Sequence, residues 1–419
     1  MENGRWPGAA NNYRQTMKRI AIILAALMLV GGTQESGAVE KRKVHYTTAT
    51  KTITVRGGVS YCGPFSGGLA CIKTNNKKWF VIDKTGNKLF DIPEGYYPPQ
   101  AEYDDLKMDV TFDNGRLMIV ESLSLSRKNA CIINDKGVIV KQFKNIWAAS
   151  PLLNGLAILQ MPKGYGWEAR YIDSDGNIVP CNAPVIQPIL QGYCTVFRLK
   201  EGRRLFFDEK KKMFGYMDEK CNIVIPARFK SAYTFSQGVA KVQNNEDLWG
   251  FIDKNGAYVI EPTYTNEPTN FNYLHAMVTD KRGVQYIINR KGEFLFSNEN
   301  KMFELMRPHL GHGDKAYAVY GYHGKSFIMD ISLQPVAPCN VESLGYLADF
   351  TDNYFLWSDC NACTSKKWMY DWQGNELMVY WGTKFSEGLA SLSIQEYNGM
   401  GGYINEYGEV IVKFQDTQF

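Results

Sequence analysis

The chain has 419 residues, of which 45% are hydrophobic and 13% aromatic, and its formal net charge is +4. This composition can supply a packed core, which excludes a largely disordered chain. A nearly neutral chain without a long basic stripe is also a poor binder of nucleic acid, because neutralising phosphates takes clustered lysine and arginine. The 25 Tyr, 22 Phe and 38 Gly favour strands joined by short turns.

Residues 1–38 have the order of a secretory signal peptide. Lys18 and Arg19 precede an apolar run at 20–30, and small and polar residues follow it up to Ala38. That order is typical of export, and the run is shorter than the roughly 20 residues that span a membrane. No cysteine follows before Cys62, so a lipoprotein signal is disfavoured. We expect a periplasmic, extracellular or cell-surface protein without a membrane span after signal removal, and Met17 is an alternative start.

A short phrase recurs along the rest of the chain: an apolar run, Asp or Asn, two residues, Gly, and a second apolar run. It predicts a hairpin turn, because the short side chain bonds nearby amides and Gly accepts a positive φ. Seven copies have the Gly, and in two weaker copies, at Asp218 and Asp330, Cys221 and Leu333 take its place. The nine Asp or Asn positions lie 34 to 51 residues apart, which indicates a repeat of about 40 residues. The predicted turn residues are Asp83, Gly86, Asp173, Gly176, Asp253, Gly256, Asn405 and Gly408.

A second phrase, Phe-Ser-x-Gly-Leu/Val-Ala, begins at Phe65, Phe235 and Phe385 and precedes the turn by 18 to 20 residues. Its Leu-Ala end predicts a third strand, so each unit is an antiparallel meander. Pro226, Pro262 and Pro338 follow the turns, and we expect proline to end the last strand because it cannot donate to a ladder.

The segment from Phe235 to Tyr264, which contains Trp249-Gly250-Phe251, resembles a WG (KWG) repeat. Trp79 keeps the tryptophan of the motif but not the glycine. The resemblance implies a binding or structural module without an assigned chemistry. The repeat core is expected to contain Phe65, Trp79, Phe235, Trp249, Gly250, Phe251 and Phe385.

We therefore predict an all-β fold with three parts: a signal peptide at 1–38, an N-terminal strand region at 39–60, and about nine repeats at 61–419 that are degenerate between 300 and 380. One unit cannot bury its own apolar face, so neighbours must stack. A propeller-like ring and a curved solenoid both fit, and the ring is favoured because closure removes exposed edges.

Aromatic residues between the strands are the candidate binding residues. Tyr96, Tyr97, Tyr165 and Trp167 lie in glycine- or proline-rich stretches, and aromatic rings on loops suit contacts with peptides or sugars. The alternative is that they fold back over the core.

His309, His312 and Asp314 have a metal-like spacing, but the segment lacks a rigid ligand framework. A glycine-rich surface loop is therefore the preferred interpretation. Among the nine cysteines, only Cys360 and Cys363 form a close pair, and a structural role is favoured for them over redox or metal chemistry.

The sequence contains no nucleophile elbow, phosphate loop, dinucleotide fingerprint or HExxH motif. It therefore predicts a non-catalytic binding or scaffolding protein that recognises protein or glycan outside the cytoplasm and uses no cofactor. The alternative is a hydrolase of extracellular glycan with carboxylates on one rim of the array.

Overall fold

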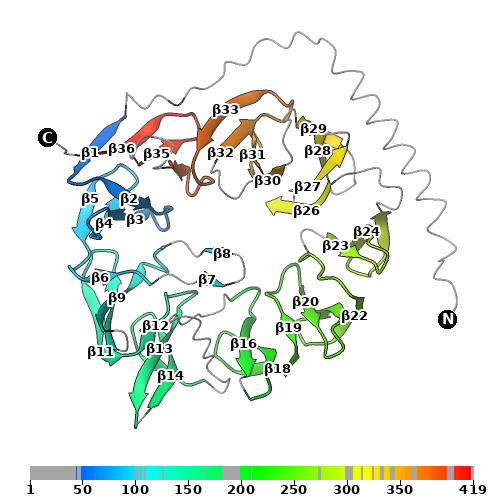
Figure 1. Ribbon diagram of the computed structural model, residues 1–419, viewed down its shortest axis with the longest axis horizontal. Coiled ribbons are helices and arrows are strands. Elements are labelled where there is room, and N and C mark those ends of the chain that lie inside the picture. The colour runs from blue at the N-terminus through cyan, green and yellow to red at the C-terminus, as the bar shows by residue number, and fades with distance from the viewer. Residues whose placement is uncertain are drawn as a thin grey trace, which may run out of the picture. The chain divides into compact units, whose positions relative to one another are not determined.

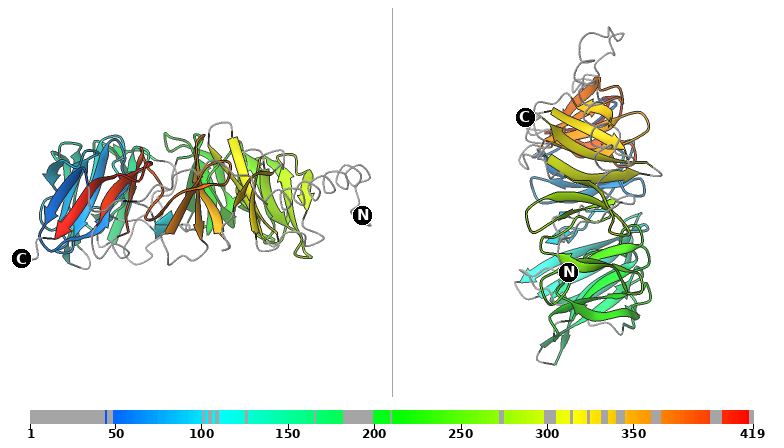
Figure 2. Two further views of the ribbon diagram at one scale, coloured as in Figure 1. Left: turned by 90° about the horizontal axis from the view of Figure 1, so that it is seen from above. Right: turned by 90° about the vertical axis from the view of Figure 1, so that its right-hand side faces the viewer.

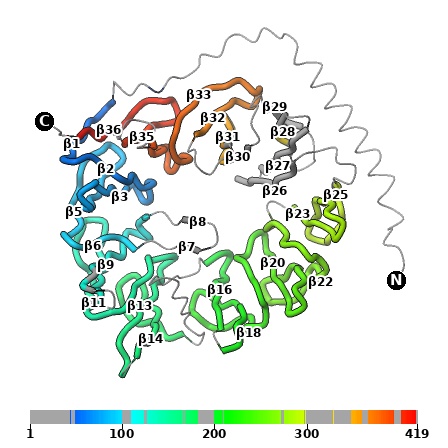
Figure 3. The backbone as a smooth tube through the Cα atoms, viewed as in Figure 1, coloured from blue at the N-terminus to red at the C-terminus, as the bar shows by residue number. Residues whose placement is uncertain are grey.

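The computed structural model describes residues 44, 49–99, 102–103, 106–107, 110–124, 127–164, 166–181, 199–208, 210–271, 275–297, 305–312, 315–322, 325–330, 335–339, 345–359, 366–393 and 401–416. Figure 3 traces the backbone, with most of these residues in colour. The signal-peptide prediction for 1–38 lies outside these residues. Two compact units are present: a terminal unit of Lys43–Arg228 and Tyr380–Phe419, and a middle unit that contains Phe229–Val379.

Every secondary-structure element of the described residues is a β-strand (Figure 1). The strands form nine sheets of three or four strands and one two-stranded sheet. Apart from one parallel pair, the pairings are antiparallel between strands that are adjacent or nearly adjacent in sequence. The prediction of an all-β array of antiparallel meanders is therefore confirmed, and the sheets have the form of β-propeller blades.

The terminal unit holds five of the larger sheets. Their strands are β2 (Val59–Cys62), β3 (Leu69–Thr74), β4 (Trp79–Asp83) and β5 (Lys88–Asp91); β6 (Tyr96–Tyr97), β9 (Arg116–Ser124), β10 (Arg127–Asn134) and β11 (Ile139–Ile146); β12 (Ala148–Ala149), β13 (Leu156–Lys163), β14 (Gly166–Asp173) and β15 (Ile178–Val179); β16 (Arg204–Asp208), β17 (Met213–Met217) and β18 (Ile223–Phe229); and β34 (Leu389–Ser391), β35 (Gly402–Asn405), β36 (Val410–Asp416) and β1 (Lys51–Val55). The short pair β7 (Glu102–Tyr103) and β8 (Leu106–Lys107) is separate.

The middle unit holds the other four. Their strands are β19 (Ser231–Ala232), β20 (Val239–Gln243), β21 (Trp249–Asp253) and β22 (Tyr258–Tyr264); β23 (His275–Thr279), β24 (Gln285–Asn289) and β25 (Phe294–Ser297); β26 (Leu305–His312), β27 (Lys315–Tyr322), β28 (Lys325–Asp330) and β29 (Pro335–Cys339); and β30 (Gly345–Phe350), β31 (Phe355–Asp359), β32 (Lys366–Tyr370) and β33 (Glu376–Trp381).

One sheet of the terminal unit combines the two ends of the chain. β1 pairs in parallel with β36, from Lys51 opposite Val412 to Val55 opposite Asp416. The two strands lie side by side in Figure 1 and in the left view of Figure 2. The N-terminal strand region thus supplies the outer strand of the C-terminal sheet, which joins segments about 360 residues apart by backbone hydrogen bonds.

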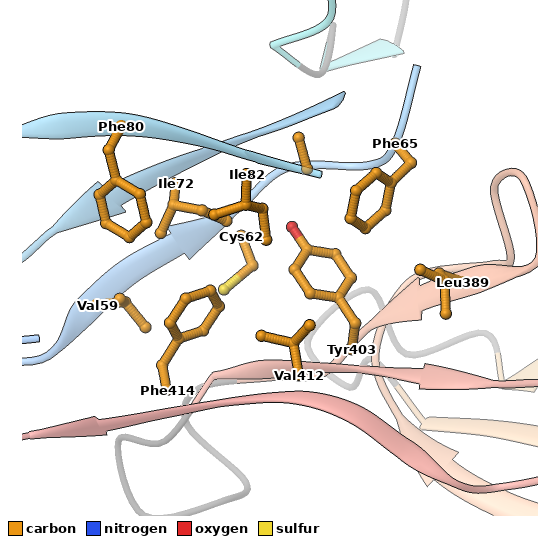
Figure 4. Packing of buried hydrophobic residues seen from close by; sticks show 11 residues of the cluster. Val59, Cys62, Phe65, Ile72, Phe80, Ile82, Leu389, Tyr403, Val412 and Phe414 are labelled. Atoms are coloured by element: carbon orange, nitrogen blue, oxygen red, sulfur yellow. The ribbon is translucent and has the colours of Figure 1, made fainter. Parts of the chain in front are cut away.

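Apolar side chains fill the space between consecutive sheets. Between the β1–β36 sheet and the β2–β5 sheet, the rings of Phe65 and Tyr403 are 4.9 Å apart (Figure 4), and the Tyr403 hydroxyl donates to the Gly63 carbonyl at 2.5 Å. Of the residues expected in the repeat core, Phe65, Trp79, Phe235, Trp249, Gly250 and Phe251 are buried and Phe385 is half-buried.

The Asp-x-x-Gly phrase forms the same turn wherever it is described. In the first copy the Asp83 carboxylate accepts hydrogen bonds from the amides of Thr85 and Asn87 at 2.9 and 2.8 Å, and Gly86 has a φ of +80°. Asp173, Asp253 and Asn405 accept the same pair of amide bonds. The Asp or Asn side chain therefore accepts hydrogen bonds from backbone amides that have no strand partner within the turn.

The Phe-Ser-x-Gly phrase forms a two-residue hairpin turn. Ser236 and Val239 exchange backbone hydrogen bonds, and both central residues, Gln237 and Gly238, have positive φ. Positive φ at both positions defines a type I′ turn, whose twist matches that of the flanking strands. The same turn occurs at 66–69, 113–116, 153–156, 200–203 and 386–389.

The expectation that proline ends the last strand is wrong. Pro226, Pro262 and Pro338 lie inside β18, β22 and β29. Each of these is the outermost strand of its sheet. An edge strand accepts proline because one side of its backbone donates to no ladder.

Gly250 of the Trp-Gly pair is required by a close approach of two backbones. A Cβ at this position would lie 2.6 Å from the Ile260 carbonyl oxygen and 2.8 Å from the nitrogen of Pro262, where the β21–β22 register shifts. Gly215 and Gly402 hold the same place, with the carbonyl oxygens of Ile225 and Val412 at 2.6 and 2.5 Å. The glycine of the motif therefore recurs where the tryptophan does not.

We predict that Gly250→Ala destabilises the protein by about 1–3 kcal/mol, because its methyl group must push β22 away. Gly166→Ala in β14 is the control, since the nearest atom to its added Cβ is 3.9 Å away and its φ is not positive. Urea unfolding of both variants measures the difference. Equal stabilities of the two variants would contradict this explanation of the motif.

Candidate functional site

Two adjoining hollows surround β5 in the terminal unit. One has a volume of about 880 Å³ and lies against β1 and the loop that follows it. The other has a volume of about 740 Å³ and extends to β6. They share Asn76, Lys78, Lys88 and Asp91, and we call them together the β5 groove.

Hydrogen bonds between two loops build one wall of the β5 groove. Gly57 and Gly58, with φ of +82° and +73°, turn the chain from β1 into β2. The Asn75 side chain donates to the Gly57 carbonyl at 2.6 Å and the Asn75 amide donates to the Gly58 carbonyl at 3.1 Å. The Gly57 amide donates to Asp416 of β36 at 2.8 Å. The wall thus depends on the meeting of the chain's two ends.

The charged side chains of the groove are nearly balanced in sign. The exposed cations are Arg56, Lys77, Lys78 and Lys88, and the carboxylates are Asp91, Glu94 and Asp416. Lys78 pairs with Glu94 at 3.3 Å and Lys88 with Asp91 at 2.6 Å. Exposed pairs of this kind contribute about 0–1 kcal/mol each, so they can open to contact a ligand at little cost.

Tyr96 and Tyr97 line the second hollow. They form the short strand β6 rather than a loop, opposite Glu121 and Val120 of β9. Both are half-buried, and both pack against core clusters while they contribute to the lining of the hollow. Packing against the core supports the interpretation of these tyrosines as core cover, and their interpretation as binding residues stays a prediction.

The Tyr96 hydroxyl lies in a partly buried environment. Burial is the main cause that raises its pKa to about 12, and the neighbouring Cys131 thiol adds to the effect. Tyr96 is therefore neutral at physiological pH.

Trp167, His309 and His312 are the other candidate residues that the structure places in strands. Tyr165 and Asp314 are outside the described residues, as are Cys360 and Cys363. Trp167 belongs to β14, where its backbone is opposite Pro162. His309 and His312 belong to β26, so the prediction of a loop there is wrong up to His312, because 305–312 pairs with β27. Within the described part of the chain, no group of three or more His, Cys, Asp or Glu residues could hold a metal ion.

Sequence reasoning missed Arg56, Asn76 and Lys88. Each looks like an ordinary exposed turn or strand-end residue, and no motif singles it out. They lie around one groove only because β1 joins the C-terminal sheet beside β5. No local sequence motif indicates that β1 pairs with β36. The Gly57-Gly58 pair was the one feature of this region that could have indicated a tight, functional turn.

Comparison with known proteins identifies the repeats. The family described as WG containing repeat matches residues 59–77, 214–246 and 249–266. The resemblance seen in the sequence is confirmed, and the chain carries WG repeats. No curated protein matches the sequence. In the part of the chain that is described, no helix has the length and apolar character to cross a membrane.

Solved structures of similar fold have little sequence identity to this chain. A eukaryotic initiation factor is 10% identical, with 84% of this chain and 96% of that chain covered and a TM-score of 0.55. The computationally designed Ika8 protein is 9% identical, with 88% and 98% covered and a TM-score of 0.41. The WD40 β-propeller domain of Doa1 is 10% identical, with 70% and 90% covered and a TM-score of 0.28. The likeness to the initiation factor concerns the fold alone.

We predict that the Tyr96→Phe variant loses less stability than wild type does when the pH becomes alkaline. The unfolded chain releases the Tyr96 proton near pH 10 and the folded chain keeps it until about pH 12, so the stability that Tyr96 contributes below pH 10 is lost as the pH rises to 12. The unfolding free energy of wild type minus that of Tyr96→Phe should fall between about pH 9 and about pH 11.5. Urea unfolding at the two pH values measures it, and a constant difference would contradict the assignment.

Proposed function

We propose that this chain, which carries WG repeats, is a non-catalytic binding protein that holds an extended protein segment or glycan in the β5 groove, outside the cytoplasm. The observation that carries the proposal is the groove itself: two hollows that join along one strand and are lined by exposed cations, amides and partly exposed tyrosines. An elongated site with mixed polar and aromatic lining suits an extended ligand.

The strand order favours a protein segment over a glycan. β1 and β5 are each the last strand of their sheets, and the first hollow is lined by residues of β1 and β5. An extended peptide can pair with such an edge through its backbone while neighbouring pockets receive alternate side chains. A glycan would use the tyrosine rings of the second hollow instead.

The carboxylates of the groove support binding rather than hydrolysis. Asp91 and Glu94 are held by lysines, and Asp416 accepts the Gly57 amide. A catalytic pair of carboxylates needs environments that differ between its two members, whereas Asp91, Glu94 and Asp416 are all exposed.

Export is part of the same proposal. It is supported by the Lys18-Arg19 pair, the apolar run and the small residues up to Ala38, which have the order of a signal peptide. N-terminal sequencing of the protein from a periplasmic or secreted fraction should find a start near Val39. An intact Met1 or Met17 on protein recovered from the cytosol would contradict it.

The binding proposal is tested with peptide and glycan arrays, followed by calorimetry on the hits. Arg56→Ala with Lys88→Ala should raise the Kd for a peptide hit roughly tenfold, because both exposed cations line the groove. Lys136→Ala is the control, since Lys136 is an exposed cation in the turn between β10 and β11 and is not among the residues that line the two hollows, and it should leave the Kd unchanged.

Three outcomes would overturn the proposal. They are hits that the double variant binds as well as wild type does, an absence of hits on both arrays, and turnover of a glycan in a hydrolase assay run beside them. If only glycans bind, and the double variant weakens their binding, the groove remains the proposed site and the ligand is a glycan rather than a protein segment.

A further inference from the structure

Two cysteines meet between neighbouring sheets of the terminal unit. Cys181 follows β15, and Cys221 lies in the turn between β17 and β18. The Cys181 thiol donates to the Cys221 carbonyl oxygen at 3.5 Å, and its sulfur is 4.0 Å from that of Met217. Both cysteines belong to the cluster that packs the β12–β15 sheet against the β16–β18 sheet. Both are in the thiol form, and they are 40 positions apart in sequence.

The environment of Cys221 favours its thiolate. The hydrogen bond from the Cys181 side chain is the main cause that lowers the pKa of Cys221, and the Arg204 guanidinium adds to it. Arg204 is itself 1% exposed and donates to the carbonyls of Leu153 and Asn154. By contrast, burial raises the pKa of Cys62 and Cys71 to about 12. The thiolate is the reactive form in disulfide exchange.

Access to the pair is asymmetric. Cys181 is half-buried, whereas Cys221 is fully buried. A dissolved oxidant can therefore reach Cys181 first, and Cys221 is placed to react with whatever forms there. Cys221 also has a φ of +61° and occupies the position where other copies of this turn have glycine. A positive φ favours glycine, so the cysteine side chain is present here although the backbone conformation disfavours it.

We propose that Cys181 and Cys221 are a redox pair whose disulfide links the β12–β15 sheet to the β16–β18 sheet. The accessible Cys181 thiol attacks a disulfide oxidant with loss of its proton, forms a mixed disulfide and expels one thiolate, which takes up a proton. The Cys221 thiolate then attacks the Cys181 sulfur and expels the second thiolate. The two cysteines lose two protons and two electrons, and the disulfide oxidant is reduced to two thiols.

The disulfide would close a loop from residue 181 to residue 221 and restrict the unfolded chain. Such a bond typically raises the melting temperature, here by roughly 5 °C or more. It would also hold the two sheets together without changing the β5 groove. The proposal of a redox pair and the proposal of a ligand site can therefore be contradicted independently of each other.

The test uses the folded protein exposed to oxidised glutathione, digested without reduction and analysed by mass spectrometry. A peptide linking Cys181 to Cys221 is expected, with Cys71 and Cys131 remaining free. The proposal is overturned if both cysteines stay reduced, if Cys181 remains as a glutathione adduct, or if either cysteine is linked to a different one.

Melting curves provide the second measurement. The oxidised wild type should melt roughly 5 °C above the reduced form, and this gap should vanish in Cys181→Ser and in Cys221→Gly. Cys221→Gly places at the turn the residue that other copies use, so it removes the thiol and relieves the positive φ, while it leaves a small cavity in the cluster. Cys71→Ala, which removes a thiol outside the pair, should keep the gap. If the oxidised and reduced forms of Cys221→Gly still differ in melting temperature, the proposal is wrong.

Discussion

The structure depends on the fact that each small sheet has two apolar faces and can bury them only against neighbours. Side chains alternate along a strand, so Ala70 and Ile72 of β3 pack toward the C-terminal sheet while Leu69 and Cys71 pack toward β9 and β10. A sheet at the end of a row would leave one face in water. In the terminal unit, the parallel pairing of β1 with β36 places the chain's two ends in one sheet that packs on the next.

Hydrogen bonds from the repeat phrases fix the spacing of these sheets. The Ser386 hydroxyl donates to the Phe65 carbonyl at 2.8 Å, and the Ser66 hydroxyl donates to the Phe112 carbonyl at 3.0 Å. Glu387, at the centre of one type I′ turn, accepts the amides of Gly67 and Gly68 of the next turn. The serine of the phrase thus bonds to the phenylalanine position of the following copy, so a conserved-looking local motif also carries the contact between repeats.

The local structure was predictable because its causes are local. Asp83 with Gly86 encodes a turn through a side-chain hydrogen bond and a positive φ, both within four residues. Gly250 was recognised as part of a motif, but its reason, the backbone of β22 within 2.6 Å of an added Cβ, follows only from the register shift of two strands. The spacing of residues in the sequence therefore could not predict how closely β22 approaches Gly250.

The candidate site was predictable only in part, for the same reason. Tyr96 and Tyr97 stood out as aromatic residues beside prolines and do line the groove. Arg56 and Lys88 did not, because the first hollow exists only where β1 lies beside the sheet of β5. The pairing of Cys181 with Cys221 likewise depends on how two sheets pack, and the count of nine cysteines contains no information on it.

The dependence of one sheet on the next can be measured directly with a double-mutant cycle between Phe65 and Tyr403. Their rings are 4.9 Å apart and come from neighbouring sheets (Figure 4). Unfolding free energies of Phe65→Leu, Tyr403→Leu and the double variant should give a favourable coupling of about 0.5–1.5 kcal/mol. Single-variant losses that simply add would mean that the two sheets are stabilised independently, and would contradict the account.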